Sequence, residues 1–361
     1  MGDGGAHVDF HLELAPVPHN KTQYFICMKE LVIQKDISLA KYTTFALGGN
    51  ARFFIEARSY EDLACAYAFA KENKLPVFLL GGGSNILVGA EGYNGVVIKV
   101  SLLGIEEKTS GRANDILLEV GAGVSWDSLV LYTTQKGWWG FENLSAIPGS
   151  VGATPVQNIG AYGKEIAEHI VWVEVFDPQT NTLKKISKEE CAFGYRASAF
   201  QKQYREYCIT RVCYRLSRSG APVLSYKDFQ EYALSENVSP QEIRKVVCAI
   251  RAKKFPSLKE YGTAGSFFIN PTISNEEYRA LQAIYPDIPG FETKEGIKIP
   301  LAWILDSVLA LRGHKQGNAR VYEKHALVLV SERFACAHDV RTLAKNISAR
   351  VYEKTHIRNF P

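Results

Sequence analysis

The sequence predicts an α+β protein with two domains. Signals for helices and for short buried strands follow one another in mixed order rather than in a strict βα repeat. Two uncharged, glycine-rich loops interrupt them, LGGGSNIL at 80–87 and IPGSVGATPVQNIGAYG at 147–163. Because 361 residues exceed the length of one typical domain and the pattern pauses at Ser217–Pro222, we place a domain boundary there.

The first half of the chain carries most of the strand signals. A helix starts after Ser59, where Asp62 stands at the third helical position. The short apolar run Val77–Leu80 predicts a buried strand that leads into the first glycine-rich loop. We expect further strands at Val96–Val100, Ile116–Val120, Ile170–Phe176 and Tyr207–Leu216, and a helix at Ser125–Lys136.

Helix-start signals dominate the second half. Ser239-Pro240-Gln241-Glu242 combines a cap residue, a proline at the first helical position and a glutamate that completes a capping box. This pattern predicts a helix that runs to about Lys253, and Ser274-Asn275-Glu276-Glu277 starts another. We expect a strand at Ala326–Val330 and a last amphipathic helix at His338–Lys354.

Composition and charge exclude several classes of protein. The net charge of +4 is small and no block of basic residues stands out, so nucleic acid is not an expected partner. No apolar run approaches the roughly 18 residues of a membrane span. The seven cysteines form no Cys-x-x-Cys pair and no zinc spacing, so we expect no metal and reduced thiols in a cytoplasmic protein.

The first residues differ in character from the rest. They lack a basic segment followed by an apolar core, so they do not predict a secretory signal. Met28 is the only methionine besides Met1. We therefore expect residues 1–36 to be an N-terminal extension, either a disordered tail or a start upstream of the natural one.

The two glycine-rich loops together predict a large phosphate-bearing cofactor. In the first loop, consecutive amides with Ser84 and Asn85 would make an anion nest, although a tight turn after a strand is the plainer alternative. In the second loop, Tyr162 would stack on a flat ring or cover a core edge. G-x-G-x-x-G is absent at a strand–helix junction. The candidate cofactor residues are Gly81, Gly82, Gly83, Ser84, Asn85, Gly149, Gly152, Asn158, Ile159, Gly160 and Tyr162.

Two further segments could carry chemistry. FGYRASAF at 193–200 sets Arg196 among aromatics, where it would offer a donor fork to a carboxylate or enolate, or simply stack at the surface. TAGSFFINP at 263–271 sets Ser266 in an apolar stretch, where its hydroxyl needs a buried partner or acts as a proton donor. No G-x-S-x-G elbow supports a hydrolase serine. Tyr226 and Lys254, taken alone, would be surface residues.

The order of these motifs resembles one known family. From about Tyr42 onward the sequence contains TTFALGGNA, LGGGSNIL, GAG, IPGSVGATPVQNIGAYG, FGYR, SYKDF, AGSFFINP and HALVLV. It is similar in this to UDP-N-acetylenolpyruvoylglucosamine reductase, the FAD enzyme of bacterial peptidoglycan synthesis. The resemblance implies a FAD-binding module of the vanillyl-alcohol oxidase type at 42–219 and a smaller α+β substrate-binding domain at 220–361.

The resemblance also implies a reaction and its site. NADPH reduces FAD and leaves; UDP-N-acetylglucosamine enolpyruvate then takes hydride from flavin N5 at C3 and a proton from Ser266 at C2, giving UDP-N-acetylmuramate. Arg196 would polarise the substrate carboxylate, and Arg251 would reach the flavin. Tyr226 would lie on a loop over the nucleotide, with Lys254 and Asn270 on the diphosphate and substrate side. No His or Cys anchor is evident beside the loops, so FAD is expected to bind non-covalently, in a monomer that serves cell-wall biogenesis, cell shape and cell division.

One departure from the family concerns the chain end. The family pattern continues after a proline with a catalytic glutamate, and Pro361 takes the proline's place. The resemblance therefore implies lowered activity, since loss of a positioned acid or base typically costs 10²- to 10⁴-fold. The alternatives are an impaired relative that only binds flavin or sugar nucleotide, and another flavin oxidoreductase of the same fold, such as a sugar-lactone oxidase.

Overall fold

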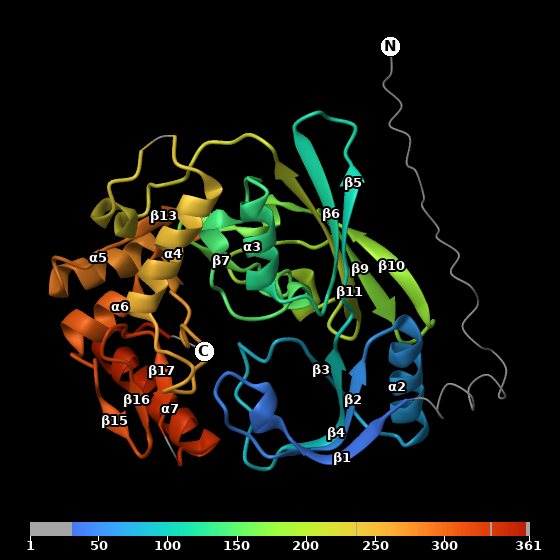
Figure 1. The fold of residues 1–361 in the computed structure, drawn as a ribbon. Coiled ribbons are helices and arrows are strands. Elements are labelled where there is room, and N and C mark those ends of the chain that lie inside the picture. Colours follow the sequence, from blue (N-terminus) through green and yellow to red (C-terminus); the bar gives the residue numbers. More distant parts are fainter. Residues whose placement is uncertain (1–30, 236, 333, 359–361) are drawn as a thin grey trace.

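The computed structural model describes residues 31–358 apart from 236 and 333. Two sheets, drawn blue to green in Figure 1, occupy one side, and the orange-to-red C-terminal part forms a separate lobe beside them. The α+β class is confirmed. The expectations for residues 1–30 and for the chain end at 359–361 concern positions outside the described residues.

The first sheet has four strands in the order β1 (Ile33–Ser38), β2 (Asn50–Ala57), β4 (Tyr93–Val100) and β3 (Val77–Leu80). β2 and β3 run parallel to β4, and β1 is an antiparallel edge strand. Helix α2 (Tyr60–Glu72) crosses over between β2 and β3. It begins with the expected capping box, in which the Ser59 hydroxyl accepts from the Asp62 amide at 3.1 Å.

The second sheet has five antiparallel strands in the order β10 (Thr182–Ser187), β9 (Ile170–Asp177), β11 (Cys208–Ser217), β6 (Asp115–Gly121) and β5 (Ile105–Thr109). Helix α3 (Trp126–Gln135) follows β6. One buried apolar cluster contains residues of both sheets, among them Ile98 of β4 and Val212 of β11. The two sheets therefore pack around a shared core.

Several short elements lie in the loops between the longer strands and helices. They are the 3₁₀ helices Leu39–Tyr42, Glu142–Leu144, Val151–Ala153, Ile166–Glu168, Ala199–Gln201 and Lys227–Glu231, and the hairpin of β7 (Gly160–Ala161) and β8 (Lys164–Glu165). Three of these elements, Glu142–Leu144, Val151–Ala153 and β7, are formed by the sequence around the second glycine-rich loop. That loop is therefore folded rather than open.

The C-terminal lobe contains small sheets and helices around its own core. Its elements are β12 (Thr272–Ile273), α5 (Asn275–Ile284), β13 (Phe291–Thr293), β14 (Gly296–Lys298), α6 (Leu301–Trp303) with a π-helical turn at Ile304–Val308, β15 (Lys315–Gln316), β16 (Ala319–Val321), β17 (Leu329–Ser331) and α7 (Ala337–Thr355). Phe45, from the first half of the chain, is buried in this core. The lobe is thus packed against the segment that connects β1 and β2 in the sheet-bearing part.

Helix α4 (Pro240–Lys254) behaves differently from the lobe that follows it. Its apolar residues Ile243, Val247 and Ile250 form a separate buried cluster with Tyr162 and Phe229. In Figure 1 it lies beside α3, and the two helices are in contact. A helix that follows the expected boundary at 219/220 therefore covers the sheet-bearing part of the molecule.

The expected helices are confirmed as α2, α3, α4, α5 and α7, and the strands as β3, β4, β6, β9 and β11. The strand expected at Ala326–Val330 is wrong in its first half, because β17 covers only Leu329–Ser331. The extension expected over 1–36 is wrong at its end. Ile33–Ser38 forms β1, held by backbone pairing in which Ile33 stands opposite Ile55.

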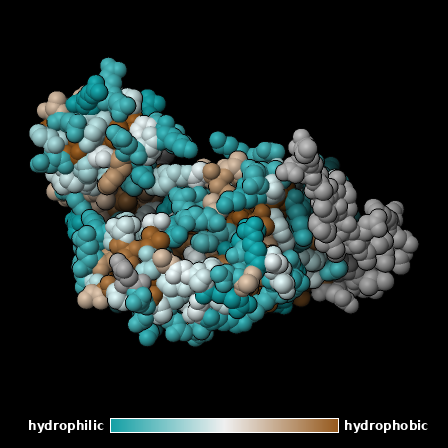
Figure 2. All heavy atoms as spheres, turned by 90° about the horizontal axis from the view of Figure 1, so that it is seen from above, coloured by the Kyte–Doolittle hydropathy of each residue, from teal (hydrophilic) through white to brown (hydrophobic). Residues whose placement is uncertain are grey.

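The thiols and the surface complete the description. Cys191, Cys208, Cys213, Cys248 and Cys336 are free thiols, as expected. None of the described helices is long and apolar enough to cross a bilayer. On the face seen in Figure 2, hydrophilic residues predominate and apolar residues gather only in small patches.

Candidate active site

A cavity of about 340 Å³ lies where the two sheets meet. Both glycine-rich loops line it, the first at the end of β3 and the second after α3. The predicted cofactor residues in its wall are Gly81, Gly82, Gly83, Ser84, Asn85, Gly149, Gly152 and Ile159. The structure thus brings together two segments that are more than sixty residues apart, as the cofactor hypothesis requires.

The two loops meet backbone to backbone. A Cβ atom on Gly82 would lie 2.5 Å from the Gly149 Cα atom, and Gly149 itself has a φ of +133°. The Ser84 hydroxyl donates to the Pro148 carbonyl at 2.9 Å. Only glycine permits so close an approach, so this part of the wall is bare backbone with polar amides.

The rest of the wall suits a flavin nucleotide. Phe78, Trp126 and Phe200 contribute apolar surface for flat rings, and Arg205 and Tyr207 contribute a cation and a hydroxyl. Apolar walls beside bare amides and one guanidinium match the aromatic and diphosphate parts of FAD. Sequence reasoning missed these five residues, since none belongs to a glycine-rich motif.

Cys208 also lines the cavity, which corrects the expectation that no cysteine stands beside the loops. It is fully buried, and burial raises the pKa of its thiol to about 12. The thiol therefore stays protonated and unreactive. Among the described residues of the wall there is no histidine.

Arg196 is held outside that cavity by the second loop. Its guanidinium donates to the Gly160 carbonyl at 2.7 Å and to the Asn158 carbonyl at 3.3 Å, and it lies 5.4 Å from the Tyr195 ring centre. The backbone of Arg196 is left-handed, with a φ of +53°. Asn158 and Gly160, expected to contact the cofactor, thus position this arginine instead of lining the cavity.

Ser266 lies on an exposed loop of the C-terminal lobe. Its backbone bridges to Val328, while its hydroxyl makes no hydrogen bond with any residue the structure describes. The alternative of a buried serine bonded to backbone is therefore wrong. Arg196 and Ser266 come from different parts of the chain, and their meeting at one substrate stays a prediction.

Tyr162, Tyr226 and Arg251 form a second group beside α4. The Tyr162 ring is buried and meets the Tyr226 ring edge-on, with centres 5.4 Å apart. Burial raises the pKa of Tyr162 to about 12 and lowers the pKa of Arg251, whose Nε donates to the Ala146 carbonyl at 3.1 Å. Neither Tyr162 nor Arg251 lines the cavity, so Tyr162 covers a core edge, as its alternative predicted.

The predicted substrate residues already have partners. Lys254 is paired with the carboxylate of Asp228, and Asn270 accepts from the Leu301 amide at 3.0 Å where α6 begins. His325, which sequence reasoning missed, lies close enough for the Lys254 ammonium to disfavour its protonation. Burial first, and then Lys254, lower the pKa of His325 to about 4.

The two-sheet module with a glycine-lined cavity defines a FAD-binding protein. A family model described as FAD binding domain matches residues 51–186, and one described as UDP-N-acetylenolpyruvoylglucosamine reductase, C-terminal domain, matches 257–358. The α+β flavin module followed by a smaller domain is thereby confirmed.

Whole-chain comparisons agree. UDP-N-acetylenolpyruvoylglucosamine reductase of Pasteurella multocida is 40% identical over 88% of this chain and 92% of its own length. The enzyme of Escherichia coli K12 is 38% identical over 89% of this chain and 93% of its own. The crystal structure from Thermus caldophilus covers 90% of this chain and 96% of its own, with a TM-score of 0.61 and 26% identity. The chain belongs to the UDP-N-acetylenolpyruvoylglucosamine reductase family.

The contact between the loops can be tested at Gly82. We expect Gly82→Ala to raise the Kd for FAD about 10-fold or more, because its Cβ would push the Gly149 backbone away. Titration of the apoprotein with FAD, followed by flavin fluorescence, measures this. Gly111→Ala is the control for backbone strain alone, since Gly111 has a φ of +75° but a Cβ there meets nothing within 4 Å. Equal Kd values in both variants would contradict the assignment.

A second prediction concerns pH. His325 stays neutral in the folded protein down to about pH 4, whereas an unfolded histidine protonates near 6.5. The stability gained by keeping His325 neutral in the folded protein is present above about pH 6.5 and is lost as the pH falls from about 6.5 toward 4. We expect His325→Gln to remove up to about 2 kcal/mol of the stability lost between about pH 7 and pH 5. Urea unfolding at both values measures it, and an unchanged difference would refute the assignment.

Proposed function

We propose that this chain reduces UDP-N-acetylglucosamine enolpyruvate to UDP-N-acetylmuramate, with FAD as bound cofactor and NADPH as reductant. The observation that carries the proposal is the single cavity lined by both glycine-rich loops in a chain of this family. The setting we propose is cytoplasmic synthesis of peptidoglycan precursors, which serves cell shape and division, by a monomeric enzyme.

FAD, when bound, supplies hydride to the vinyl carbon C3. The chain's own residues then handle the charge and the proton. Arg196 binds the substrate carboxylate and stabilises the negative charge that develops there, because two loop carbonyls already fix the direction of its guanidinium. Ser266 donates the proton to C2, a role supported by its exposed hydroxyl, which has no partner among the described residues.

The nucleotide would lie along the segment before α4 and the end of that helix. Tyr226 is 42% exposed and offers a ring face for stacking. Lys254 supplies the cation for the diphosphate, and Asp228 holds it in place. The Asn270 oxygen is used by α6, which leaves its amide nitrogen for the substrate.

The alternatives are weaker. A sugar-lactone oxidase forms no enolate that needs a proton, so it gives no task to Ser266 or to the fixed Arg196. A relative that only binds flavin or sugar nucleotide needs neither residue. The family membership favours the reductase over both.

The proposal predicts a yellow protein that oxidises NADPH catalytically, beyond the one equivalent that reduces its flavin, only when the enolpyruvyl sugar nucleotide is supplied. Consumption of NADPH is followed by its absorbance, and the product by mass spectrometry. UDP-N-acetylglucosamine, which lacks the enolpyruvyl group, is the matched control. A colourless protein that takes up no FAD, or one that consumes NADPH equally with both sugars, would overturn the proposal.

The role of Ser266 is tested by separating the two half-reactions. We expect Ser266→Ala to leave flavin reduction by NADPH intact and to slow reoxidation by substrate roughly 10²- to 10⁴-fold, since proton donation follows hydride transfer. Ser266→Cys keeps a weaker donor at this position, so its flavin reoxidation by substrate should be slowed less than in Ser266→Ala. Stopped-flow traces that slow equally in both halves would rule out this role.

A further inference from the structure

Ala146, at the entry to the second glycine-rich loop, has a strained backbone. Its φ is +57°, although it is not glycine. A left-handed conformation costs an L-residue roughly 1–2 kcal/mol and persists only where the surroundings enforce it. Three residues later, Gly149 meets Gly82 in the cavity wall. The conformation of Ala146 therefore helps to set where the loop meets the cavity.

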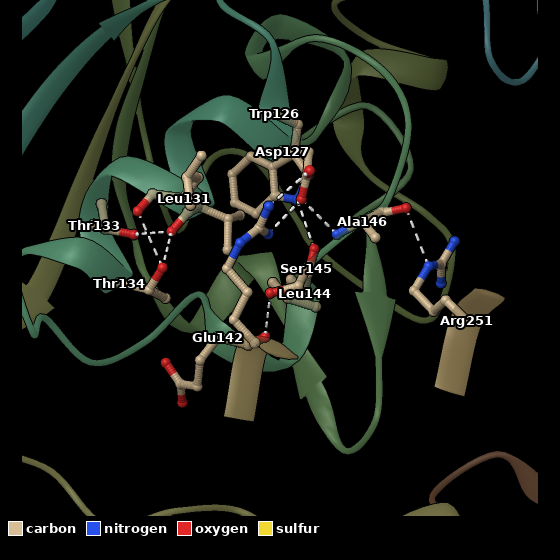
Figure 3. A network of polar contacts seen from close by, with 12 residues as sticks. Trp126, Asp127, Leu131, Thr133, Thr134, Glu142, Leu144, Ser145, Ala146 and Arg251 are labelled. Atoms are coloured by element: carbon tan, nitrogen blue, oxygen red, sulfur yellow. Dashed lines mark hydrogen bonds and ion pairs between the residues drawn. The ribbon is translucent and has the colours of Figure 1, made fainter. Parts of the chain in front are cut away.

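Side chains hold Ala146 from both sides, as Figure 3 shows. Its amide donates to Asp127 Oδ1 at 2.6 Å, and its carbonyl accepts from Arg251 Nε at 3.1 Å. Asp127 is in the first turn of α3, and Arg251 is near the end of α4. The two peptide groups of one strained residue are thus fixed by two different helices.

Arg244 joins these two helices. Its guanidinium binds both oxygens of Asp127, at 2.5 and 2.9 Å. The arginine side chain is 13% exposed and the aspartate 38%, so water screens the pair only partly. Burial raises the pKa of Asp127, but hydrogen bonds from Arg244 and Ala146 outweigh it and leave the pKa lowered. Asp127 is therefore a carboxylate with its Oδ1 shared between Arg244 and the Ala146 amide.

Arg244 and Arg251 lie about two helical turns apart on α4 and share a face. Arg244 binds the Asp127 carboxylate, and Arg251 donates a hydrogen bond to the Ala146 carbonyl. The same helix ends at Lys254, next to the substrate group. Displacing α4 would therefore release the loop and move Arg251 and Lys254 together.

We propose that the Asp127–Arg244 ion pair is a positioning pair for the flavin site, docking α4 on α3 and holding Ala146 in the conformation that sets the second glycine-rich loop. It rests on the proposed function only in taking FAD as the ligand of the cavity. Neither residue lines the cavity, so both act through Ala146.

The test measures FAD affinity and the visible spectrum of the bound flavin in Arg244→Met, Arg244→Lys, Asp127→Asn and the double variant Asp127→Asn/Arg244→Met. We expect Arg244→Met to raise the Kd for FAD about 10-fold and to shift the flavin spectrum. Arg244→Lys should weaken FAD binding less, because lysine keeps the positive charge although it cannot bind both Asp127 oxygens as the planar guanidinium does. The double variant should weaken FAD binding no more than the more damaging single variant does, because both substitutions break the same contact.

Arg211→Met is the matched control. Arg211 also contacts two carboxylates, Glu106 and Glu119, and it does not line the cavity. It should lower Tm while leaving the Kd for FAD and the spectrum as in the wild type. If Arg244→Met behaves like this control, or if the losses in the double variant add, the proposal is wrong.

Three outcomes keep the test decisive. If Arg244→Met does not fold, wild-type Kd values in both Arg244→Lys and Asp127→Asn would overturn the inference. Wild-type protein that takes up no FAD would overturn the proposed function and this inference with it. Wild-type uptake of FAD with unchanged variants would overturn the inference alone.

Discussion

The close approach of Gly82 to Gly149 is the constraint on which the site depends. Backbone atoms of two distant loops touch there because neither residue has a side chain. Glycine-rich backbone loses much conformational freedom when it becomes ordered, so these loops need fixed partners to hold their conformation. Hydrogen bonds hold the two loops in place. The Trp126 amide at the start of α3 donates to the Gly149 carbonyl at 3.1 Å, and Ser84 of the first loop donates to Pro148 of the second. The shape of the cavity therefore depends on these hydrogen bonds.

Features that depend on local or chemically specific sequence signals could be predicted from the sequence alone. Helices α2, α4 and α5 were predicted from their capping residues, and each capping box is present. The two glycine-rich loops predicted a phosphate-bearing cofactor, because few other ligands require so much bare backbone. The flavin identity and the roles of Arg196 and Ser266 came from the resemblance instead, since spacing alone left both residues with ordinary structural alternatives.

What the sequence could not provide depends on long-range contacts. β1 was taken for an extension, because an edge strand is stabilised by its partner β2 rather than by its own pattern. Cys208 and Arg205 enter the cavity wall through the folding of distant segments. Asn158 and Gly160 belong to the glycine-rich motif but hold Arg196 instead of lining the cavity. Motif membership identified the region, and only the fold divided its residues between wall and support.

Helix α4 shows why the two halves of such a site need a rigid link. It lies beyond the expected domain boundary, yet its buried face packs with Tyr162 against the sheet-bearing part. Arg251 and Lys254 are less than one turn apart on it, one bonded to Ala146 beside the second glycine-rich loop and one paired with Asp228 in the proposed substrate site. Hydride transfer is sensitive to small misplacements of donor and acceptor. A single helix that carries both contacts fixes their relative position, so under the proposed mechanism the C-terminal lobe needs only to present Ser266 and does not set that geometry itself.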